Sequence, residues 1–364
     1  MSKSKILPAL AAALMFSVSV LPQAALACTR TVYVGDDNTV ITGRNMDWME
    51  DMQTDLWVFP RGMKRSGNAG PGSPEWSAKY GSVIASGYNT ASADGMNEKG
   101  LVANMLYLAE SDYGNDTGRT PLVIGMWAQY VLDNFATVAE TVEGLKAANF
   151  QIVAPKLPNG SAATLHLSIS DPSGDSAIFE YVKGELVVHH SKDYKVMTNS
   201  PVYDQQLALT TYWDKVGGNA FLPGTISAAD RFVRASFLLD SATKKIDKSF
   251  IDAVPGKTYA NQAVAQSLSI MRGVSVPLGI SSPGEPNIAS TLWRTAADQT
   301  NLVYFFDSAT TPNTFWVEFA DMDFSEGAEP KKLPIAGGHY YSGNTAEHFE
   351  AAKPFEFMTA NGRD

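Results

Sequence analysis

The chain has 364 residues, of which 45% are hydrophobic, 18% charged and 10% aromatic. This is the composition of a globular protein, and it excludes a disordered, collagen-like or coiled-coil chain. The formal net charge of −10 argues against a nucleic-acid partner, because phosphate binding needs a positive field. The single cysteine excludes an internal disulfide framework and a zinc site built from cysteines.

The first 27 residues have the pattern of a secretory signal. Lys3 and Lys5 precede an apolar run, and residues 25–27 form an Ala-Leu-Ala sequence of the kind that a signal peptidase cleaves. Two prolines interrupt the run, which makes it a poor membrane-spanning helix. We therefore expect residues 1–27 to be removed on export, leaving a periplasmic protein with no membrane partner.

Cleavage after residue 27 would make Cys28, the only cysteine, the first residue of the mature chain. Three interpretations compete: coincidence, the lipidated cysteine of an anchored periplasmic binding protein, and an N-terminal nucleophile. The order of alanine and leucine before Cys28 is the reverse of that in lipoprotein signals. A free α-amine has a pKa near ~8 and lies close to its own side chain, so it can act as the base that ionises the thiol.

The predicted elements run from strands to a helix pair, to strands, to helices and back to strands. This order favours stacked sheets between helical layers over a βαβ dinucleotide fold. The predicted strands are 29–34, 40–43, 83–87, 101–108, 165–170, 177–182, 186–189, 291–296, 302–307 and 314–319, and the predicted helices are 121–133, 137–148, 227–239 and 261–272. Residues 62–79 are predicted as a surface loop, 94–100 as a connection, and 321–364 as a polar tail that packs on the domain or on a neighbouring subunit.

The common catalytic motifs are missing from the sequence. It contains no G-x-G-x-x-G after a strand, no H-E-x-x-H and no G-x-S-x-G elbow. His166 and His189 fall in apolar strand patterns, which favours packed or surface residues over metal ligands. A hydrolase that depends on histidine therefore has little support, and a base supplied by the Cys28 amine gains by elimination.

Three groups of polar residues stand where turn or apolar residues are the default. Arg44 and Asp47 follow the second predicted strand. They form either a surface ion pair or a functional pair, in which Asp47 orients the Cys28 amine and Arg44 stabilises its thiolate. Asn199 lies just before the Ser-Pro pair at 200–201. Its side chain either forms an Asx-turn or donates a hydrogen bond to an oxyanion. Arg231 lies in the first turn of a helix, where the helix dipole disfavours a cation, so it needs a specific partner.

These motifs, in this order, resemble the choloylglycine hydrolase family, which comprises penicillin V acylases and conjugated bile salt hydrolases. The resemblance covers residues 28–319, nearest to the exported Gram-negative acylases, and rests on Cys28, Gly43–Asp47, Asp94–Leu101, Met197–Pro201 and Leu222–Phe232. It implies an α+β, four-layer αββα N-terminal nucleophile hydrolase sandwich of two antiparallel sheets. This domain would span residues 28–320, form a homotetramer and need no cofactor or metal.

The resemblance also implies roles for particular residues. Cys28 is the expected nucleophile, and Arg44, Asp47, Asn199 and Arg231 match other catalytic positions. The remaining position falls at Tyr107, whose backbone N–H is the expected second oxyanion donor. Bile salt hydrolases typically carry asparagine there, so this tyrosine argues against a bile salt substrate.

The expected reaction is hydrolysis of a small-molecule amide through an acyl-enzyme, with release of phenoxyacetate from penicillin V. Trp48 and Met105 are predicted to line an apolar acyl pocket; Trp48 suits the pocket and the core equally, whereas methionine is a common gap filler, which favours the core for Met105. Such a pocket also suits a fatty acyl chain, so the sequence leaves N-acyl-homoserine lactones, and hence quorum quenching, as an alternative. A bile salt substrate is a weaker alternative.

Overall fold

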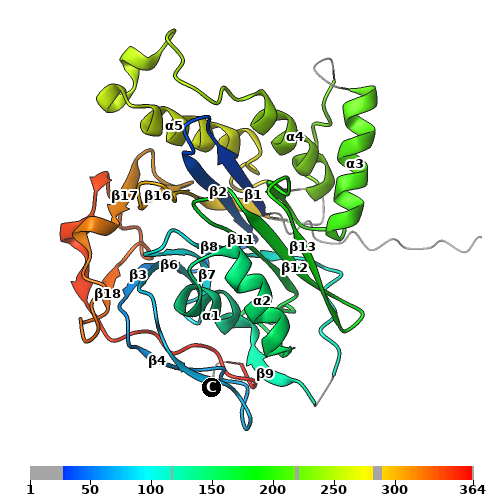
Figure 1. Ribbon diagram of the computed structural model, residues 1–364, viewed down its shortest axis with the longest axis vertical. Coiled ribbons are helices and arrows are strands. Elements are labelled where there is room, and N and C mark those ends of the chain that lie inside the picture. The colour runs from blue at the N-terminus through cyan, green and yellow to red at the C-terminus, as the bar shows by residue number, and fades with distance from the viewer. Residues whose placement is uncertain (1–27, 116–117, 218–220, 282–288, 363–364) are drawn as a thin grey trace, which may run out of the picture.

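Two large β-sheets lie face to face in the computed structural model, with helices on both outer sides (Figure 1). The model describes residues 28–115, 118–217, 221–281 and 289–362; the predicted signal at 1–27 lies outside them. Helices α4 and α5 cover one sheet, and α1 and α2 cover the other. The predicted αββα sandwich is therefore confirmed. Within the described residues, no helix is long and apolar enough to cross a membrane.

The first sheet carries Thr29–Val34, the first strand that the structure describes, second from one edge. Its neighbouring strands are antiparallel except for the parallel pair β17–β19. In spatial order they are β14 (Val196–Met197), β1 (Thr29–Val34), β2 (Val40–Trp48), β15 (Ser290–Asp298), β16 (Val303–Ser308), β17 (Thr314–Glu318) and β19 (Gly343–Asn344). Helices α4 (Ala228–Ser241) and α5 (Tyr259–Gly273) pack on its outer face, and α3 (Tyr203–Val216) packs beside α4.

The second sheet is wholly antiparallel. In spatial order its strands are β13 (Glu185–His190), β12 (Ser176–Val182), β11 (Leu165–Ser170), β8 (Val102–Tyr107), β7 (Ala91–Asn97), β6 (Ser82–Gly87), β3 (Leu56–Phe59), β18 (Lys331–Leu333) and β20 (Glu350–Ala351). Its outer face carries the short helix η1 (Ile124–Met126), α1 (Trp127–Asn134) and α2 (Val138–Ala148). Two small pairs complete the fold: β4 (Lys64–Ser66) with β5 (Glu75–Ser77), and β9 (Thr120–Val123) with β10 (Phe150–Val153).

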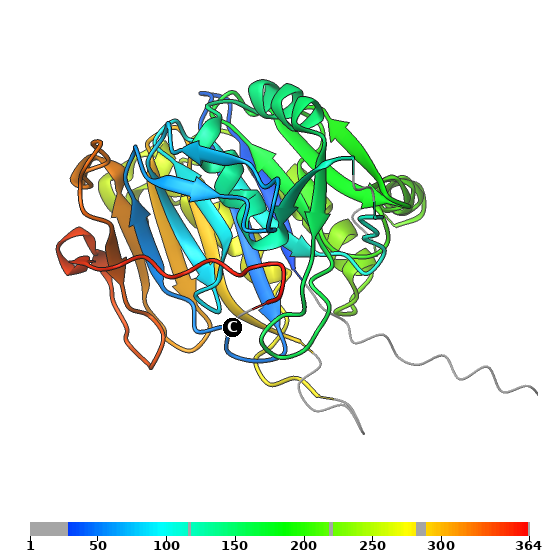
Figure 2. The same ribbon diagram turned by 90° about the horizontal axis from the view of Figure 1, so that it is seen from below.

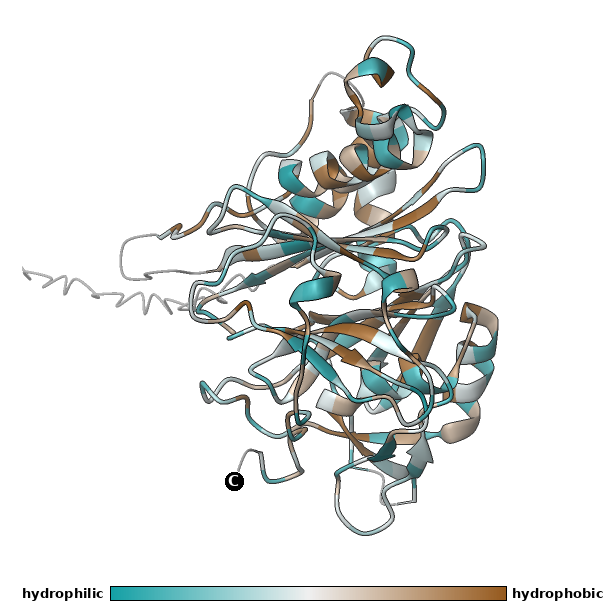
Figure 3. Ribbon diagram, turned by 90° about the vertical axis from the view of Figure 1, so that its left-hand side faces the viewer, coloured by the Kyte–Doolittle hydropathy of each residue, from teal (hydrophilic) through white to brown (hydrophobic). Residues whose placement is uncertain are grey.

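The layers enclose two hydrophobic cores. One fills the space between the sheets and under α4 and α5, and the other lies between the second sheet and the η1–α2 segment. Figure 2 views the sheets from below, through their faces, and Figure 3 shows them from the side, with hydrophobic residues along the strands in the middle of the molecule. Cys28 and Trp48 belong to the first core, whereas Met105 belongs to the second.

The local signals for helix starts are confirmed. The Thr137 hydroxyl accepts a hydrogen bond from the N–H of Glu140 (3.2 Å) at the start of α2, and the Ser227 hydroxyl accepts one from the N–H of Asp230 (3.3 Å) at the start of α4. Such caps satisfy N–H groups that have no partner inside the helix. The α4 cap fixes where that helix begins, and thereby places Arg231 in its first turn.

Strand β2 differs from its prediction in a way that matters for the site. It continues to Trp48, so Arg44 and Asp47 lie inside the strand and not just beyond it. The predicted connection at 94–100 is likewise largely strand, because β7 runs from Ala91 to Asn97. Each segment carries a charged residue that looks exposed in the sequence, yet Arg44 and Asp94 are buried, with their side chains 4.0 Å apart.

Three other predictions need correction. Residues 121–133 are not one helix, since β9 and η1 precede α1. The predicted loop at 62–79 contains the β4–β5 pair. Helix α3 was not predicted, because polar side chains cover most of its length and only Tyr203 and Gln206 are buried. Residues 331–351 add strands to both sheets: β18 and β20 extend the second sheet, and β19 pairs with β17 of the first.

Gly95 provides a test of how closely α1 packs on the second sheet. A Cβ at Gly95 would meet Ile84 Cγ2 and the Val83 carbonyl oxygen at 2.7 Å and Leu132 Cδ1 at 3.0 Å. We expect Gly95→Ala to lower the free energy of unfolding by about 1–3 kcal/mol, the usual cost of overpacking a core. Urea denaturation measures this. Gly224→Ala, where no atom lies within 4 Å, should change stability little; equal effects of the two variants would contradict close packing.

Candidate active site

The β1–β2 hairpin places Cys28 next to Asp47. Thr29 pairs with Asn45 in this hairpin, so Cys28, one residue before β1, lies beside the last residues of β2. The Cys28 thiol is within hydrogen-bond distance of the Asp47 carbonyl oxygen (3.7 Å), and Cys28 is 2% exposed. The strand pairing alone therefore brings together two of the residues predicted from the sequence.

Arg231 of α4 connects four parts of the site. Its Nη1 donates to the Cys28 carbonyl oxygen (2.6 Å) and to the Thr29 hydroxyl (2.5 Å). Its Nη2 donates to Asn199 Oδ1 (2.9 Å), and its Nη1 lies 3.9 Å from Asp47 Oδ2. These are the specific partners that its position in the first turn of a helix predicted. A fully buried guanidinium needs them, because an unpaired buried charge is costly.

Asn199 has its amide orientation fixed by two donors. The Cys28 backbone N–H (2.6 Å) and Arg231 both donate to Oδ1, so Nδ2 is directed to the other side, where it donates to the Tyr107 carbonyl oxygen (2.6 Å). An amide nitrogen carries two hydrogens, which leaves one N–H of Asn199 for a further acceptor.

The main chain at Tyr107 faces this site. The Leu108 N–H donates to the Thr164 carbonyl oxygen, on the β11 side of β8. Because successive residues of a strand direct their N–H and C=O groups to opposite sides, those of Tyr107 are directed away from β11. The contact of the Tyr107 carbonyl with Asn199 agrees with this direction. A main-chain N–H and a side-chain N–H thus lie close together beside Cys28.

Arg44 lies between the two sheets, with its Nη2 3.9 Å from the Cys28 sulfur. The same nitrogen donates to the Met105 carbonyl oxygen (2.8 Å), Nη1 lies 4.0 Å from Asp94 Oδ2, and the guanidinium stacks on the Trp293 ring at 4.7 Å. Asp94 accepts hydrogen bonds from the Asn104 amide and the Tyr304 hydroxyl. These contacts fix a cation beside the sulfur.

Burial sets the ionisation of the site. It raises the pKa of the Cys28 thiol, against the opposing effect of Arg44, so the thiol favours its neutral form. It also raises the pKa of Asp47 to about 6, although Arg231 and a hydrogen bond from the Thr291 hydroxyl (2.5 Å to Oδ1) oppose the rise. Asp47 Oδ2 accepts no hydrogen bond from the described residues, and it is available to a further donor.

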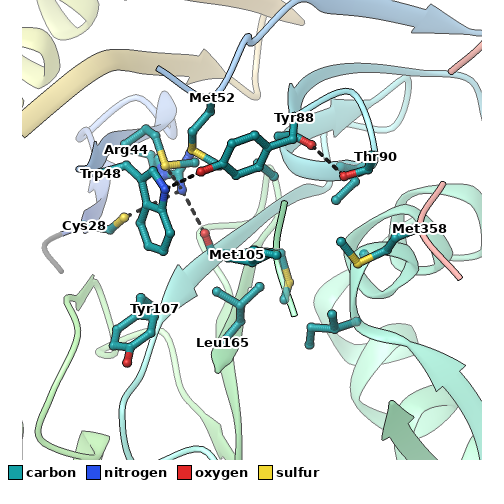
Figure 4. A pocket seen from close by; sticks show the side chains of 18 residues that line it. Cys28, Arg44, Trp48, Met52, Tyr88, Thr90, Met105, Tyr107, Leu165 and Met358 are labelled. Carbon is teal, nitrogen blue, oxygen red and sulfur yellow. Dashed lines mark hydrogen bonds between the residues drawn. The ribbon is translucent and has the colours of Figure 1, made fainter. Parts of the chain in front are cut away.

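An apolar cavity opens from Cys28. Figure 4 shows Cys28 and Trp48 at one end, with Met105 and Leu165 farther along. The Trp48 indole N–H donates to the Tyr88 hydroxyl (2.7 Å), which holds its ring at the wall, and the Trp48 and Tyr107 ring centroids are 6.3 Å apart. Trp48 and Met105, predicted as pocket residues, both line the cavity, as does Tyr107.

Two buried side chains that the sequence did not single out as functional hold the segment around Asn199. Gln206 donates to the Asn199 and Pro201 carbonyl oxygens, and its Oε1 accepts from the Thr198 N–H and hydroxyl. His166 Nε2 lies 2.9 Å from the Thr198 carbonyl oxygen.

The other nitrogen of His166, Nδ1, lies 3.1 Å from Glu180 Oε1. Burial alone would raise the pKa of Glu180, but hydrogen bonds from His166 and His189 hold it at about 2, so its carboxylate only accepts. Both ring nitrogens of His166 therefore face oxygen atoms of buried partners. His166 is a packed residue, as its strand pattern predicted.

The structure thus brings every predicted site residue close to Cys28: Arg44, Trp48, Met105 and Tyr107 line the cavity with it, and Asp47, Asn199 and Arg231 lie beside it. It adds Thr291, His166 and Asp94, whose partners come from distant segments, and Gln206, which bonds back to residues 198–201. Within the described residues, no group of three or more histidine, cysteine, aspartate or glutamate side chains is arranged to hold a metal ion.

Comparison with known proteins places the chain among enzymes. The chain is 50% identical over 349 residues to a penicillin V acylase of Pectobacterium atrosepticum, a match that covers 91% of this chain and 92% of the relative. The structure of penicillin V acylase from Agrobacterium tumefaciens superimposes with a TM-score of 0.81 at 50% identity, covering 91% of this chain and all of that one.

A mutant of the conjugated bile acid hydrolase from Clostridium perfringens shares the fold, with a TM-score of 0.68 and 23% identity over 87% of this chain and 98% of that one. The family model for linear amide C–N hydrolases of the choloylglycine hydrolase type matches residues 28–332. The protein is therefore an amide hydrolase, and it belongs to the choloylglycine hydrolase family.

Proposed function

We propose that this hydrolase removes the phenoxyacetyl group of penicillin V, with Cys28 as an N-terminal nucleophile. The observation that carries the proposal is the position of the Cys28 nitrogen and sulfur. Both lie at one end of the apolar cavity, beside two N–H groups and two arginines. In the full-length chain this nitrogen belongs to a peptide bond, and removal of residues 1–27 turns it into an amine.

The first half of the reaction forms a thioester. Because burial keeps the Cys28 thiol neutral, the amine takes its proton as Cys28 Sγ bonds to the amide carbon. The N–H groups of Asn199 and Tyr107 stabilise the oxyanion, and Arg44 stabilises negative charge on the sulfur. The Cys28 ammonium then protonates the leaving nitrogen as the C–N bond breaks.

The second half reverses these proton movements. The Cys28 amine takes a proton from water, and the hydroxide bonds to the thioester carbon. The C–S bond breaks, the carboxylic acid leaves, and the proton returns from the amine to the sulfur. Asp47 Oδ2, which lies near Arg231 and has no hydrogen-bond donor among the described residues, accepts a hydrogen bond from the amine and orients it throughout.

The cavity supports a second candidate substrate. Its lining is mostly apolar, with Thr90 and Ser92 as polar exceptions, so a straight fatty acyl chain fits it as well as a phenoxy ring does. N-acyl-homoserine lactones are therefore the alternative, with quorum quenching as the biological role. Conjugated bile salts fit less well, because Tyr107 and Trp48 narrow the cavity beside Cys28 with two rings in contact.

We also propose export and a homotetramer. Export rests on the signal pattern of residues 1–27, which also supplies the cleavage that frees Cys28. The homotetramer rests on family resemblance and on exposed large side chains on and beside α3, namely Tyr212, Val216 and Phe221. Apolar groups exposed together on one helix are typical of a protein–protein interface.

Parallel kcat/KM values on penicillin V, a long-chain N-acyl-homoserine lactone and glycocholate test the substrate. We expect penicillin V to be hydrolysed best and glycocholate worst, and a preference for glycocholate would contradict the proposal. Cys28→Ser should lower kcat/KM on penicillin V by roughly a thousandfold or more, because the nucleophile is lost.

Intact-mass measurement of the same preparation provides the control for this experiment. The chain should begin at an unmodified Cys28. An acylated, lipid-bearing Cys28, or full activity in a chain that still carries residues 1–27, would overturn the nucleophile assignment.

The ionisation of Asp47 predicts an acid limb in the pH profile. A carboxylate whose pKa is raised to about 6 is protonated below that pH and no longer accepts a hydrogen bond from the amine. A protonated amine beside it lowers this pKa again, so kcat/KM should fall with acid through a midpoint at or below about pH 6. Asp47→Asn should lower kcat/KM and abolish this limb; an unchanged limb in the variant would assign it to another group.

Gln206 should affect the rate more than substrate binding. Gln206→Met removes its hydrogen bonds to Thr198, Asn199 and Pro201 and loosens the oxyanion donor, so kcat should fall about tenfold or more with little change in KM. The matched control is Gln262→Met. Gln262 is equally buried, but it bonds to the main chain of residues 245 and 247, which are not part of the site. Equal losses of kcat in both variants, measured below their unfolding temperatures, would indicate a general effect on stability.

A further inference from the structure

The cavity has a second end, remote from Cys28, that the proposed chemistry does not explain. Figure 4 shows Cys28 and Met358 on opposite sides of the cavity, with Met105 and Leu165 between them. Met358 comes from the C-terminal tail, at the opposite end of the mature chain from Cys28, and is 4% exposed. A group that enters past Trp48 therefore meets the tail at the end of its path.

The tail is held at this place by main-chain bonds. The Met358 N–H donates to the Thr90 carbonyl oxygen (2.9 Å), and the Ala360 N–H donates to the Asn68 carbonyl oxygen (3.1 Å). Thr90 itself lines the cavity, in the turn that joins β6 to β7. Met358 is thus fixed relative to the cavity wall by the backbone, and only its flexible side chain can adjust.

Gly125 of η1 provides the surface on which Met358 lies. A Cβ at Gly125 would meet Met358 Cγ at 2.9 Å, Ala91 Cβ at 3.1 Å and Met358 Sδ at 3.2 Å. Gly125 has no positive φ, so its backbone does not require glycine. What requires glycine is the space that Met358 occupies. The length of the cavity is therefore set by a pair of residues, one with no side chain and one with a long unbranched side chain.

We infer that Met358, lying on Gly125, is the stop at the far end of the acyl cavity and sets the longest acyl chain that the enzyme hydrolyses. This rests on the proposed function, in which the cavity holds the acyl group. The substrate class that follows is amides of uncharged acyl groups of limited length, because Arg44, beside Cys28, is the one charged side chain that lines the cavity among the described residues. Neither Met358 nor Gly125 touches the reacting atoms, so their effect is on specificity.

Substitutions at Gly125 and at Met358 should change the longest acyl chain that the cavity accepts in opposite directions. Gly125→Ala adds a methyl group that pushes Met358 toward Cys28, so the longest amide that the wild-type enzyme accepts should lose about tenfold in kcat/KM. Met358→Ala opens the end of the cavity, so the next longer homologue should gain about tenfold. Butanoyl amides, which end well before Met358, should change by less than about twofold in both variants.

A matched control separates specificity from loss of core packing. Met126 follows Gly125 in η1, is 1% exposed in the same second core and does not line the cavity. Met126→Ala should therefore cost stability as Met358→Ala does and leave the chain-length profile unchanged. The profile is measured as kcat/KM on N-acyl-homoserine lactones from butanoyl to tetradecanoyl.

Binding of the free carboxylic acids to the same variants in a Cys28→Ser background, followed by calorimetry, gives the profile without turnover. Opposite shifts in Gly125→Ala and Met358→Ala support the stop. Identical profiles in these variants and the wild type, or a shift in Met126→Ala as well, overturn it. A wild-type enzyme that binds acids with a sharp length limit but hydrolyses no amide would refute the proposed function and leave the stop standing.

Discussion

The burial of charge around Cys28 is the constraint on which the rest of the structure depends. Arg44, Asp47, Asp94 and Arg231 are each at most 1% exposed, so each must find partners inside the protein. Arg231 binds the main chain of Cys28 from α4, and Arg44 bridges the two sheets to Asp94. Breaking any one of these contacts leaves a charge unpaired in the core, so the helices, the sheets and the start of the domain are held in one arrangement.

The sequence predicted the members of this cluster better than the elements that carry them. Cys28 stood out because it follows the predicted cleavage site, and Asn199 and Arg231 stood out because each is a polar residue where its local pattern does not call for one. The same patterns misplaced Arg44 and Asp47 beyond the end of β2, because strands with charged residues normally end or face water. Here β2 lies between β1 and β15 and under α5, and its charges are neutralised by residues from other segments.

Other features were beyond sequence reasoning for a different reason. Thr291 is an ordinary residue in its own segment, and only its long-range partner Asp47 gives it a place in the site. Gln206 bonds back to Asn199 through an irregular turn, which no local pattern reveals. Helix α3 is mostly exposed, so the hydrophobic period that reveals a packed helix is missing. Helix starts, by contrast, depend on contacts within a few residues, and the predicted caps of α2 and α4 are correct for that reason.

Both hydrophobic cores contribute residues to the wall of the cavity, and each surrounds a different part of it. The first core carries the groups beside the sulfur, where distances of about 3 Å decide whether charge is stabilised. The second core, with η1 and the tail, surrounds the far part of the cavity, where only shape and apolar contact matter. Residues of the second core can therefore change without disturbing the charged cluster.

Cys28 is the chain's only thiol, buried and held neutral by its surroundings. Oxidants and disulfides react with exposed thiolates, so the resting side chain is protected from sulfenic acid formation and from mixed disulfides. The remaining route to the sulfur is the apolar cavity, which admits an uncharged electrophile and slows an anionic reagent. Burial therefore keeps the Cys28 sulfur from reagents in bulk solvent and leaves it accessible to molecules that fit the apolar cavity.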